Sequence, residues 1–250
     1  MQYKYETTSP DYSDLASGRV LYSLPGHPAF PIRLASEIFQ RCLASRATIY
    51  KNTTPCTLYD PCCGAAYHLS VLAYLHRNHI REIIASDIDE RAIAVARRNL
   101  GLLNVAGLDQ RIGEITKMLE QYHKESHKEA LASADILKNR IISWVQEGPL
   151  TTRVFQSSAA DSQTMLNNIK AKSVDMVCTD VPYGRHSQWQ LSNPGELPLG
   201  SMLDALIGVL SASSIVAVVS DKGQKVAHKS YQRVEQFQIG KRRVVILKLI

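Results

Sequence analysis

Long apolar runs are missing from this 250-residue sequence. The longest of them, such as 215–219 and 244–247, are far shorter than the roughly 20 residues that a membrane-spanning helix needs. A basic and apolar leader is also missing, since residues 1–15 are polar and acidic, which argues against secretion. The sequence therefore predicts a cytoplasmic protein without a membrane partner.

Cysteine is scarce, and its five copies form no CxxC pair and no zinc-type spacing with histidine. An odd, scattered set does not build a disulfide framework, and a chain of this length needs none to hold its core. We expect reduced cytosolic thiols and no bound metal. The cysteines are Cys42, Cys56, Cys62, Cys63 and Cys178.

Acidic residues are nearly absent from residues 222–250, which contain eight Lys and Arg but a single Glu. The whole chain carries a formal charge of +6. A basic terminal segment suits a polyanionic partner through counterion release, and Lys241, Arg242 and Arg243 are its candidate RNA contacts. The same charges equally suit a solvated strand edge that lysine protects from aggregation. Charge indicates nucleic acid without deciding the matter.

Short apolar strands alternate with amphipathic helices from residue 57 onward, a rhythm typical of a parallel sheet with right-handed crossovers. An N-terminal arm and helix (1–50) precede it. A predicted helical hairpin (109–147) interrupts it, and this hairpin either braces the fold or contacts RNA. Strands are expected at 57–60, 82–87, 152–156, 173–179, 214–219, 231–238 and 242–249. Helices are expected at 31–44, 65–77, 89–100, 161–170 and 201–210.

The last two strands are joined through a glycine turn and form a terminal antiparallel pair. Such a pair is unlike the simple dinucleotide-binding repeat and is similar to the sheet of class I methyltransferases. The predicted fold is therefore α/β, a single domain (1–250) with a Rossmann-like seven-stranded class I methyltransferase sheet and a helical insertion.

The segment Asp60-Pro61-Cys62-Cys63-Gly64 follows the first strand, where an open α/β sheet binds its ligands. Gly64 permits a tight turn and close approach of a ligand. Asp87 ends the second strand, 23 residues after Gly64, in position to accept hydrogen bonds from a ribose. Asp89 is the alternative acceptor, although it is also the expected cap of the next helix. Because the GxGxxG pattern is absent, this loop alone does not identify the cofactor.

The segment 179–184 (TDVPYG) follows the fourth strand and faces the same crevice. It matches the [Asp/Asn/Ser]-Pro-Pro-[Tyr/Phe] loop of amino- and ring-nitrogen methyltransferases, with Val181 replacing the first proline. The carboxylate of Asp180 and turned-out carbonyls can accept N–H bonds from a base edge, and Tyr183 can stack on the base. The alternative is an incidental turn around Pro182. We take Asp180, Pro182 and Tyr183 as the candidate catalytic residues.

Four segments together, 17–42, 60–64 (DPCCG), 83–89 (IIASDID) and 179–184 (TDVPYG), resemble the avilamycin-resistance family of 23S rRNA guanine methyltransferases. This resemblance implies S-adenosylmethionine as cofactor, a guanine of 23S rRNA as substrate, and N1 as the methylated atom. It also suggests resistance to a ribosome-targeting antibiotic as the biological role. One departure is that Ala65-Ala66 replaces the Ser-Gly that the family pattern has after Gly64.

The resemblance also implies roles for individual residues. Asp60 and Gly64 would cradle the methionine part of the cofactor, Asp87 its ribose, and Ile88 its adenine. Asp161 would accept from the adenine amino group, or it is only a helix cap. Arg33 would close over the cofactor, or it forms a surface salt bridge. The candidate cofactor-binding residues are Asp60, Pro61, Cys62, Gly64, Asp87, Ile88, Ala160, Asp161 and Arg33.

The resemblance places the target base next to the loop after the fourth strand. Asp180 is the candidate acceptor of the N1 proton, and Arg185 and Trp189 in the following loop would hold phosphate or neighbouring bases. The target base must be unpaired or flipped out of its stack. We expect a monomer. Two other functions stay open: a small-molecule N-methyltransferase, and a non-catalytic RNA-binding protein with a degenerate cofactor pocket, for which Ala66 is the hint.

Overall fold

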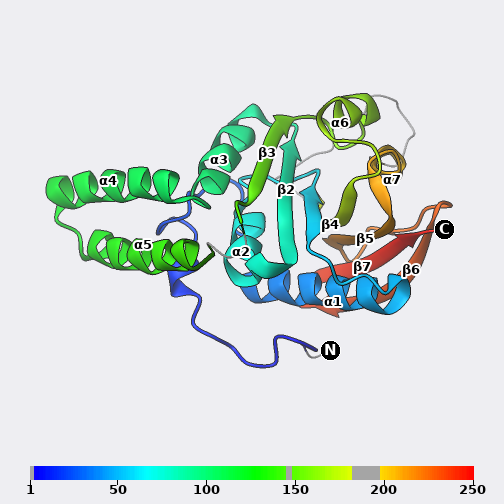
Figure 1. The fold of residues 1–250 in the computed structure, drawn as a ribbon, viewed down its shortest axis with the longest axis horizontal. Helices are drawn as coiled ribbons and strands as arrows, with labels where there is room; N and C mark the ends of the chain where they lie inside the picture. Colours follow the sequence, from blue (N-terminus) through cyan, green and yellow to red (C-terminus); the bar gives the residue numbers. More distant parts are fainter. Residues whose placement is uncertain (1–2, 145–147, 182–197) are drawn as a thin grey trace.

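One mixed sheet of seven strands organises the residues that the computed structural model describes, which are 3–144, 148–181 and 198–250 (Figure 1). The strand order is β3-β2-β1-β4-β5-β7-β6, in which the first five are parallel and the pairings of β7 with β5 and β6 are antiparallel. The predicted seven-stranded sheet and its terminal antiparallel pair are confirmed. The strands are β1 (Cys56–Asp60), β2 (Ile80–Asp87), β3 (Thr151–Gln156), β4 (Val174–Asp180), β5 (Leu210–Asp221), β6 (Tyr231–Ile239) and β7 (Arg242–Leu249).

Helices cover both faces of the sheet. One face packs against α1 (Ile32–Tyr50), α2 (Tyr67–His76) and α3 (Glu90–Gly101). The other face packs against α6 (Ser162–Asn168) and α7 (Pro198–Leu206). Several bounds differ by a few residues from the sequence prediction; in particular, α1 runs on to Tyr50 and β5 begins at Leu210, where a helix was expected to end. Leu210 belongs to the strand because it pairs with Val174 of β4.

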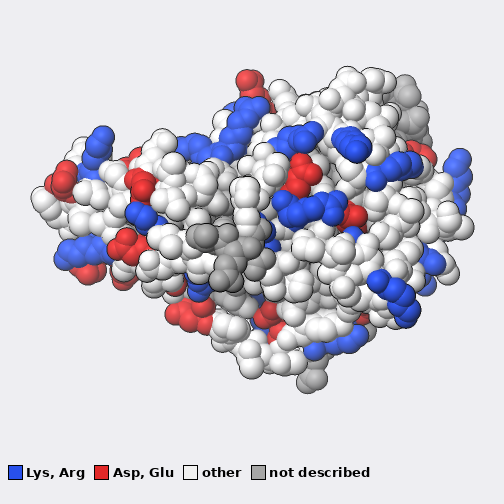
Figure 2. All heavy atoms as spheres, viewed as in Figure 1, with Lys and Arg blue, Asp and Glu red and all other residues white. Residues whose placement is uncertain are grey.

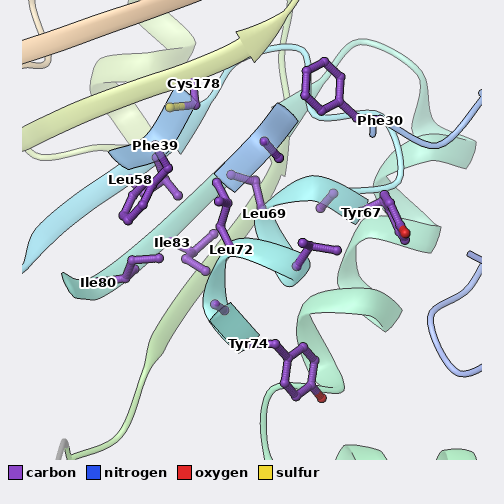
Figure 3. Close-up of a cluster of buried hydrophobic side chains, with 14 of the residues drawn as sticks. Phe30, Phe39, Leu58, Tyr67, Leu69, Leu72, Tyr74, Ile80, Ile83 and Cys178 are labelled. Carbon is purple, nitrogen blue, oxygen red and sulfur yellow. The ribbon is translucent and has the colours of Figure 1, made fainter. Parts of the chain in front are cut away.

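Side-chain alternation along the strands separates the two hydrophobic clusters. In β4, Met176 and Cys178 belong to the cluster under α1 and α2, whereas Val177 belongs to the cluster under α6 and α7. Figure 3 shows the first cluster, with Leu72 of α2 beside Ile83 of β2. Because Asp180 follows Cys178 by two residues, it lies on the α1/α2 face.

The predicted hairpin consists of α4 (Val105–Tyr122) and α5 (Glu125–Ser143), which extend away from the sheet (Figure 1). It starts before residue 109 because Asn104 caps α4, accepting from the backbone N–H of Gly107 at 2.9 Å. The guanidinium of Arg111 donates to the carbonyl of Val20 at 3.0 Å. These contacts give the hairpin a bracing role, in which it holds the N-terminal arm.

The start of the arm is fixed on α1 by one buried carboxylate. Glu37 is fully buried and accepts the backbone N–H groups of Lys4, Tyr5 and Glu6 at 2.7–2.9 Å, and it pairs with Arg41. Burial would raise the pKa of Glu37, but these donors outweigh it and hold the pKa below its ordinary value. The carboxylate therefore stabilises the docked arm in its ionised form.

Basic and acidic side chains are distributed unevenly over the face seen in Figure 2. They are mixed on the protruding hairpin, whereas Lys and Arg predominate over the part that contains the sheet. None of the helices in the described ranges has both the length and the apolar character of a membrane span.

Candidate active site

A cavity of about 410 Å³ opens at the carboxyl ends of the parallel strands. Its floor comes from the loops after β1, β2 and β4, and its wall comes from residues 22–30 of the arm. Its volume lies in the range of small-molecule sites, and its position is the one expected for a ligand of an open α/β sheet. Of the predicted site residues, Cys62, Gly64, Asp87, Ile88, Asp180 and Arg242 line it.

Asp60 supports this floor from beneath and does not line the cavity. Its side chain is fully buried, and one oxygen accepts the backbone N–H of Cys62 at 2.9 Å. The other oxygen lies 3.2 Å from Nε2 of His68 on α2. Burial would lower the pKa of His68, but the carboxylate of Asp60 outweighs it and raises the pKa above its ordinary value. Asp60 thus links the loop after β1 to α2 through its contact with His68.

Gly64 and Asp87 are joined directly, as their shared position at the strand ends predicts. Gly64 has a φ of +53°, a left-handed conformation that favours glycine, and its N–H donates to Asp87 at 2.8 Å. The second oxygen of Asp87 accepts the N–H of Asp89 at 3.0 Å. Burial raises the pKa of Asp87 despite these two donors. Asp89 in turn caps α3 through the N–H of Arg91, so its expected capping role is confirmed.

Asp180 at the end of β4 lies in the same cavity as Gly64 and Asp87. Its neighbour Val181 donates its N–H to the carbonyl of Val219, so the chain stays tied to β5 as it leaves the strand. For Asp180 and Val181, this placement agrees with the prediction that the segment after β4 faces the crevice. The remaining residues predicted from this loop, Pro182, Tyr183, Arg185 and Trp189, lie outside the described residues.

The sequence prediction missed the arm as a wall of the site. Residues 22–30 include a turn in which the N–H of His27 donates to the carbonyl of Leu24, and Phe30 packs against the ring of His68. The side chain of Asn99 on α3 accepts the N–H of Tyr22 and donates to its carbonyl, at 2.7 and 3.0 Å. The sequence signal was that the segment 17–42 is one of the four that carry the family resemblance, although its Pro-Gly-His-Pro turn reads as irregular and did not indicate a wall of the site.

Three residues that were predicted to contact the cofactor do not line the cavity. Arg33 does not close over the cavity, because its guanidinium donates to the carbonyl of Glu6 and lies 4.0 Å from the ring centroid of Tyr3. Asp161 caps α6, where its two oxygens accept the N–H and hydroxyl of Thr164 at 2.9 and 2.6 Å. The adjacent Ala160 also lies outside the cavity lining.

Other predicted residues take supporting or peripheral places. Pro61 is buried beneath the loop and does not line the cavity. Lys241 is exposed in the turn between β6 and β7, and Arg243 is half-buried with a guanidinium nitrogen 3.4 Å from the carbonyl of Gln224. Only Arg242 of this basic triplet reaches the cavity.

Ala66, the departure from the family pattern, turns away from the cavity. It has a φ of +51°, which explains why glycine suits this position, but its side chain is fully buried in the α1/α2 cluster. Its methyl group therefore packs in the core and does not crowd a ligand.

The thiols next to the cavity are unreactive by their surroundings. Burial raises the pKa of Cys62 and Cys63 well above the ordinary value. A thiol that stays protonated is a poor nucleophile, so neither cysteine is a candidate nucleophile here. Within the described ranges, no group of three His, Cys, Asp or Glu residues is placed to hold a metal.

Comparison with known proteins bears on what such a cavity does. A family model described as "rRNA methyltransferase AviRa" matches residues 1–242. A 23S rRNA (guanine(2535)-N(1))-methyltransferase from Streptomyces viridochromogenes is 37% identical over 246 residues, which cover 98% of this chain and 95% of that protein. Two solved structures of the rRNA methyltransferase AviRa from the same organism match with TM-scores of 0.85 and 0.86 at 37% identity. They cover 98% and 99% of this chain, and the matches span 96% of each of those chains.

Proposed function

Because the chain belongs to the AviRa family of rRNA methyltransferases, we propose that it methylates N1 of a guanine base in 23S ribosomal RNA, with S-adenosylmethionine as the methyl donor. The observation that carries this proposal is that Asp180 lines the same cavity as Gly64 and Asp87. The candidate acceptor for the edge of the base and the candidate site for the nucleoside part of the cofactor thus line one cavity.

The residues that line the cavity suit S-adenosylmethionine. Asp87 is an acceptor for the ribose hydroxyls, Ile88 offers an apolar surface that is 38% exposed, and Gly64 leaves room where a side chain would stand. When bound, S-adenosylmethionine supplies a methyl group on a positively charged sulfur, and displacement by a ring nitrogen leaves a neutral thioether. The activated donor makes orientation the main task of the protein.

Asp180 does the proton chemistry in this proposal. N1 of guanine carries a proton that must leave as the N–C bond forms, and the carboxylate of Asp180 accepts it. Pro182 and Tyr183 position and stack the flipped base, and Arg185 and Trp189 hold its neighbours. No metal ion and no covalent enzyme intermediate are part of this mechanism.

The RNA itself is held through phosphates by the basic segment that includes Lys241 and Arg243. Phosphate contacts fix position and register without reading sequence. We place the protein in the cytoplasm as a monomer that acts on 23S ribosomal RNA. Methylation there would confer resistance to an antibiotic that binds the ribosome near the modified base.

Asp180→Asn tests the mechanism, because it keeps size and one acceptor oxygen but cannot take a proton. In single-turnover methyl transfer with saturating S-adenosylmethionine and unmodified 23S rRNA, the rate should fall roughly 10²–10⁴-fold. Cofactor affinity by calorimetry should stay within about twofold, since other residues hold the cofactor. Asp135→Asn on the exposed surface of α5 is the matched control and should behave as the wild type.

Two other results would replace the proposal. If the wild type fails to bind S-adenosylmethionine, the chain is an RNA-binding protein without catalysis. If it binds the cofactor but methylates a metabolite pool and not rRNA, it is a small-molecule methyltransferase. Wild-type turnover in Asp180→Asn would leave the reaction intact and remove only the base assignment.

A further inference from the structure

Arg242 shares a sheet face and a sheet edge with Asp180, although 61 positions separate them in the sequence. Asp180 pairs with Val219 on β5, and Val219 pairs with Val244 on β7. Val219 and Val244 both belong to the cluster under α1 and α2. Because side chains alternate along a strand, Arg242 lies on that same face, two residues beyond Val244.

The register also fixes how far apart the two residues lie. β7 runs antiparallel to β5, so Arg242 at its start lies at the carboxyl end of β5, opposite Asp221. The two Cα atoms are separated by two strand spacings, roughly 10 Å, and by two residues along the strands, roughly 7 Å. A long arginine side chain and a flat base between them span such a gap.

The strand order separates Arg242 from the cofactor side of the cavity. The proposed cofactor contacts follow β1 and β2, whereas β4 and β5 lie between β1 and β7. Three strand spacings, roughly 14 Å, thus divide the end of β1 from Arg242. The guanidinium therefore belongs to the end of the cavity where the target base would enter.

Most arginines with little exposure have a defined partner here: Arg41 pairs with Glu37, Arg46 with Asp175, and Arg111 with Glu114. Arg242, by contrast, forms no ion pair within the described part of the chain, and its buried Nε, like that of Arg46, has no hydrogen-bond partner there. Its guanidinium lies 5.3 Å from the ring centroid of Phe30, a cation–π contact that holds it at the cavity wall. The guanidinium is therefore held in place and still has an N–H group available to donate to a ligand.

We propose that Arg242 donates to O6 of the target guanine and stabilises the negative charge that develops there during methylation. The inference rests on the proposed function. As the N1 proton passes to Asp180, the electron pair of the N–H bond stays on the base, where it is shared between N1 and O6 and then forms the N–CH₃ bond. A guanidinium at O6 favours that charge and makes N1 a better nucleophile. Preorganised donors of this kind act mainly on the transition state.

Arg242→Gln removes the charge and keeps a polar side chain. In single-turnover methyl transfer with saturating S-adenosylmethionine and unmodified 23S rRNA, the rate at neutral pH should fall roughly 10²–10³-fold, as for loss of one oxyanion donor. The pH at which the rate levels off should rise by about one unit or more, because an opposite charge shifts a pKa by roughly 1–3 units. Arg242→Lys should recover part of the rate.

The control is Arg97→Gln, which removes the same charge from the exposed surface of α3, outside the basic segment. Its rate at saturating RNA and its pH profile should match the wild type. Thermal unfolding of both variants checks that the fold is intact.

Three results would overturn the assignment. Weaker RNA binding with an unchanged rate at saturation would make Arg242 a phosphate contact. A loss of cofactor affinity by calorimetry would make it a ligand of the methionine carboxylate. A reduced rate with an unshifted pH profile would reduce it to a packing partner of Phe30. If the wild type itself does not methylate 23S rRNA, the proposed function fails before the role of Arg242 is reached.

Discussion

Exchange of glycine and alanine should affect stability and cofactor affinity at Gly64 but leave both nearly unchanged at Ala66, although both positions have left-handed backbones. Both have φ near +50°, a conformation that costs a residue with a side chain about 1–2 kcal/mol. Gly64 lines the cavity, whereas Ala66 is fully buried in the core. Substitutions at the two positions therefore distinguish the effect of backbone strain from the effect of contact with the ligand.

Gly64→Ala adds a Cβ whose nearest neighbour is Nδ1 of His27 at 3.7 Å, so nothing in the protein clashes with it. The backbone strain destabilises the folded state, and the stiffer unfolded chain offsets about 0.4–1 kcal/mol of this. We therefore expect the unfolding free energy to fall by about 0.5–1.5 kcal/mol. In a fitted cavity an extra methyl group costs about 1–3 kcal/mol of binding, or roughly a five- to hundredfold weaker affinity for S-adenosylmethionine.

Ala66→Gly relieves the same strain but removes a buried methyl group worth about 0.8 kcal/mol and loosens the unfolded chain by about 0.4–1 kcal/mol. These contributions cancel to within about 1 kcal/mol, and cofactor affinity should not change. Chemical denaturation and calorimetry measure both quantities. A tenfold gain of affinity in Ala66→Gly would refute the reasoning, since it would mean that the methyl group crowds the cofactor. Wild-type affinity in Gly64→Ala would remove Gly64 from the site.

Three further outcomes are expected. Asp87→Ala should weaken S-adenosylmethionine binding by roughly 10–100-fold, the value of hydrogen bonds to a charged group, and should also loosen the Gly64 turn, which thermal unfolding would detect. Glu37 has a lowered pKa in the folded state, so the stability that it contributes is complete above about pH 4.5 and is lost as the pH falls through the folded pKa. Glu37→Gln should therefore reduce the acid dependence of the unfolding free energy. Reversing Lys241 and Arg243 to Glu should weaken RNA binding and reduce its log–log salt slope by about one for each phosphate that is no longer bound, with cofactor affinity unchanged; an unaltered slope would make this a solvated edge.

The strand-end residues of the site were predictable because the rule behind them is local. Gly64, Asp87 and Asp180 each follow a short apolar run, and the carboxyl ends of parallel strands meet at one edge. Sequence alone could not separate the two roles of an aspartate at such an end. Asp87 is the last residue of β2 and Asp161 lies in the segment that follows β3, yet Asp161 caps a helix while Asp87 lines the cavity. The difference depends on which neighbouring N–H groups each carboxylate meets.

Arg242 illustrates what local rules miss. The charge count marked it as one of three equivalent basic residues, but alternation along β7 directs Arg243 away from the face that Arg242 shares with Asp180, and Lys241 lies in the turn before the strand. That distinction depends on the register of β7 against β5, which tertiary packing sets. A basic cluster in a sequence can therefore contain one residue with catalytic geometry among others that serve only electrostatic attraction.

The position of the helical insertion follows from the same geometry. The arm reaches the cavity only because it is held at Tyr22, whose backbone is bonded by Asn99 of α3 and whose hydroxyl donates to Glu114 of α4 at 2.8 Å. The amide of Asn99 also donates to the carbonyl of Ala65 in the loop after β1. One side chain thus connects the arm, the loop beside Gly64 and the helix that leads into the hairpin. The hairpin inserted directly after α3 thus supports the cavity wall through the arm, while none of the residues of α4 or α5 lines the cavity.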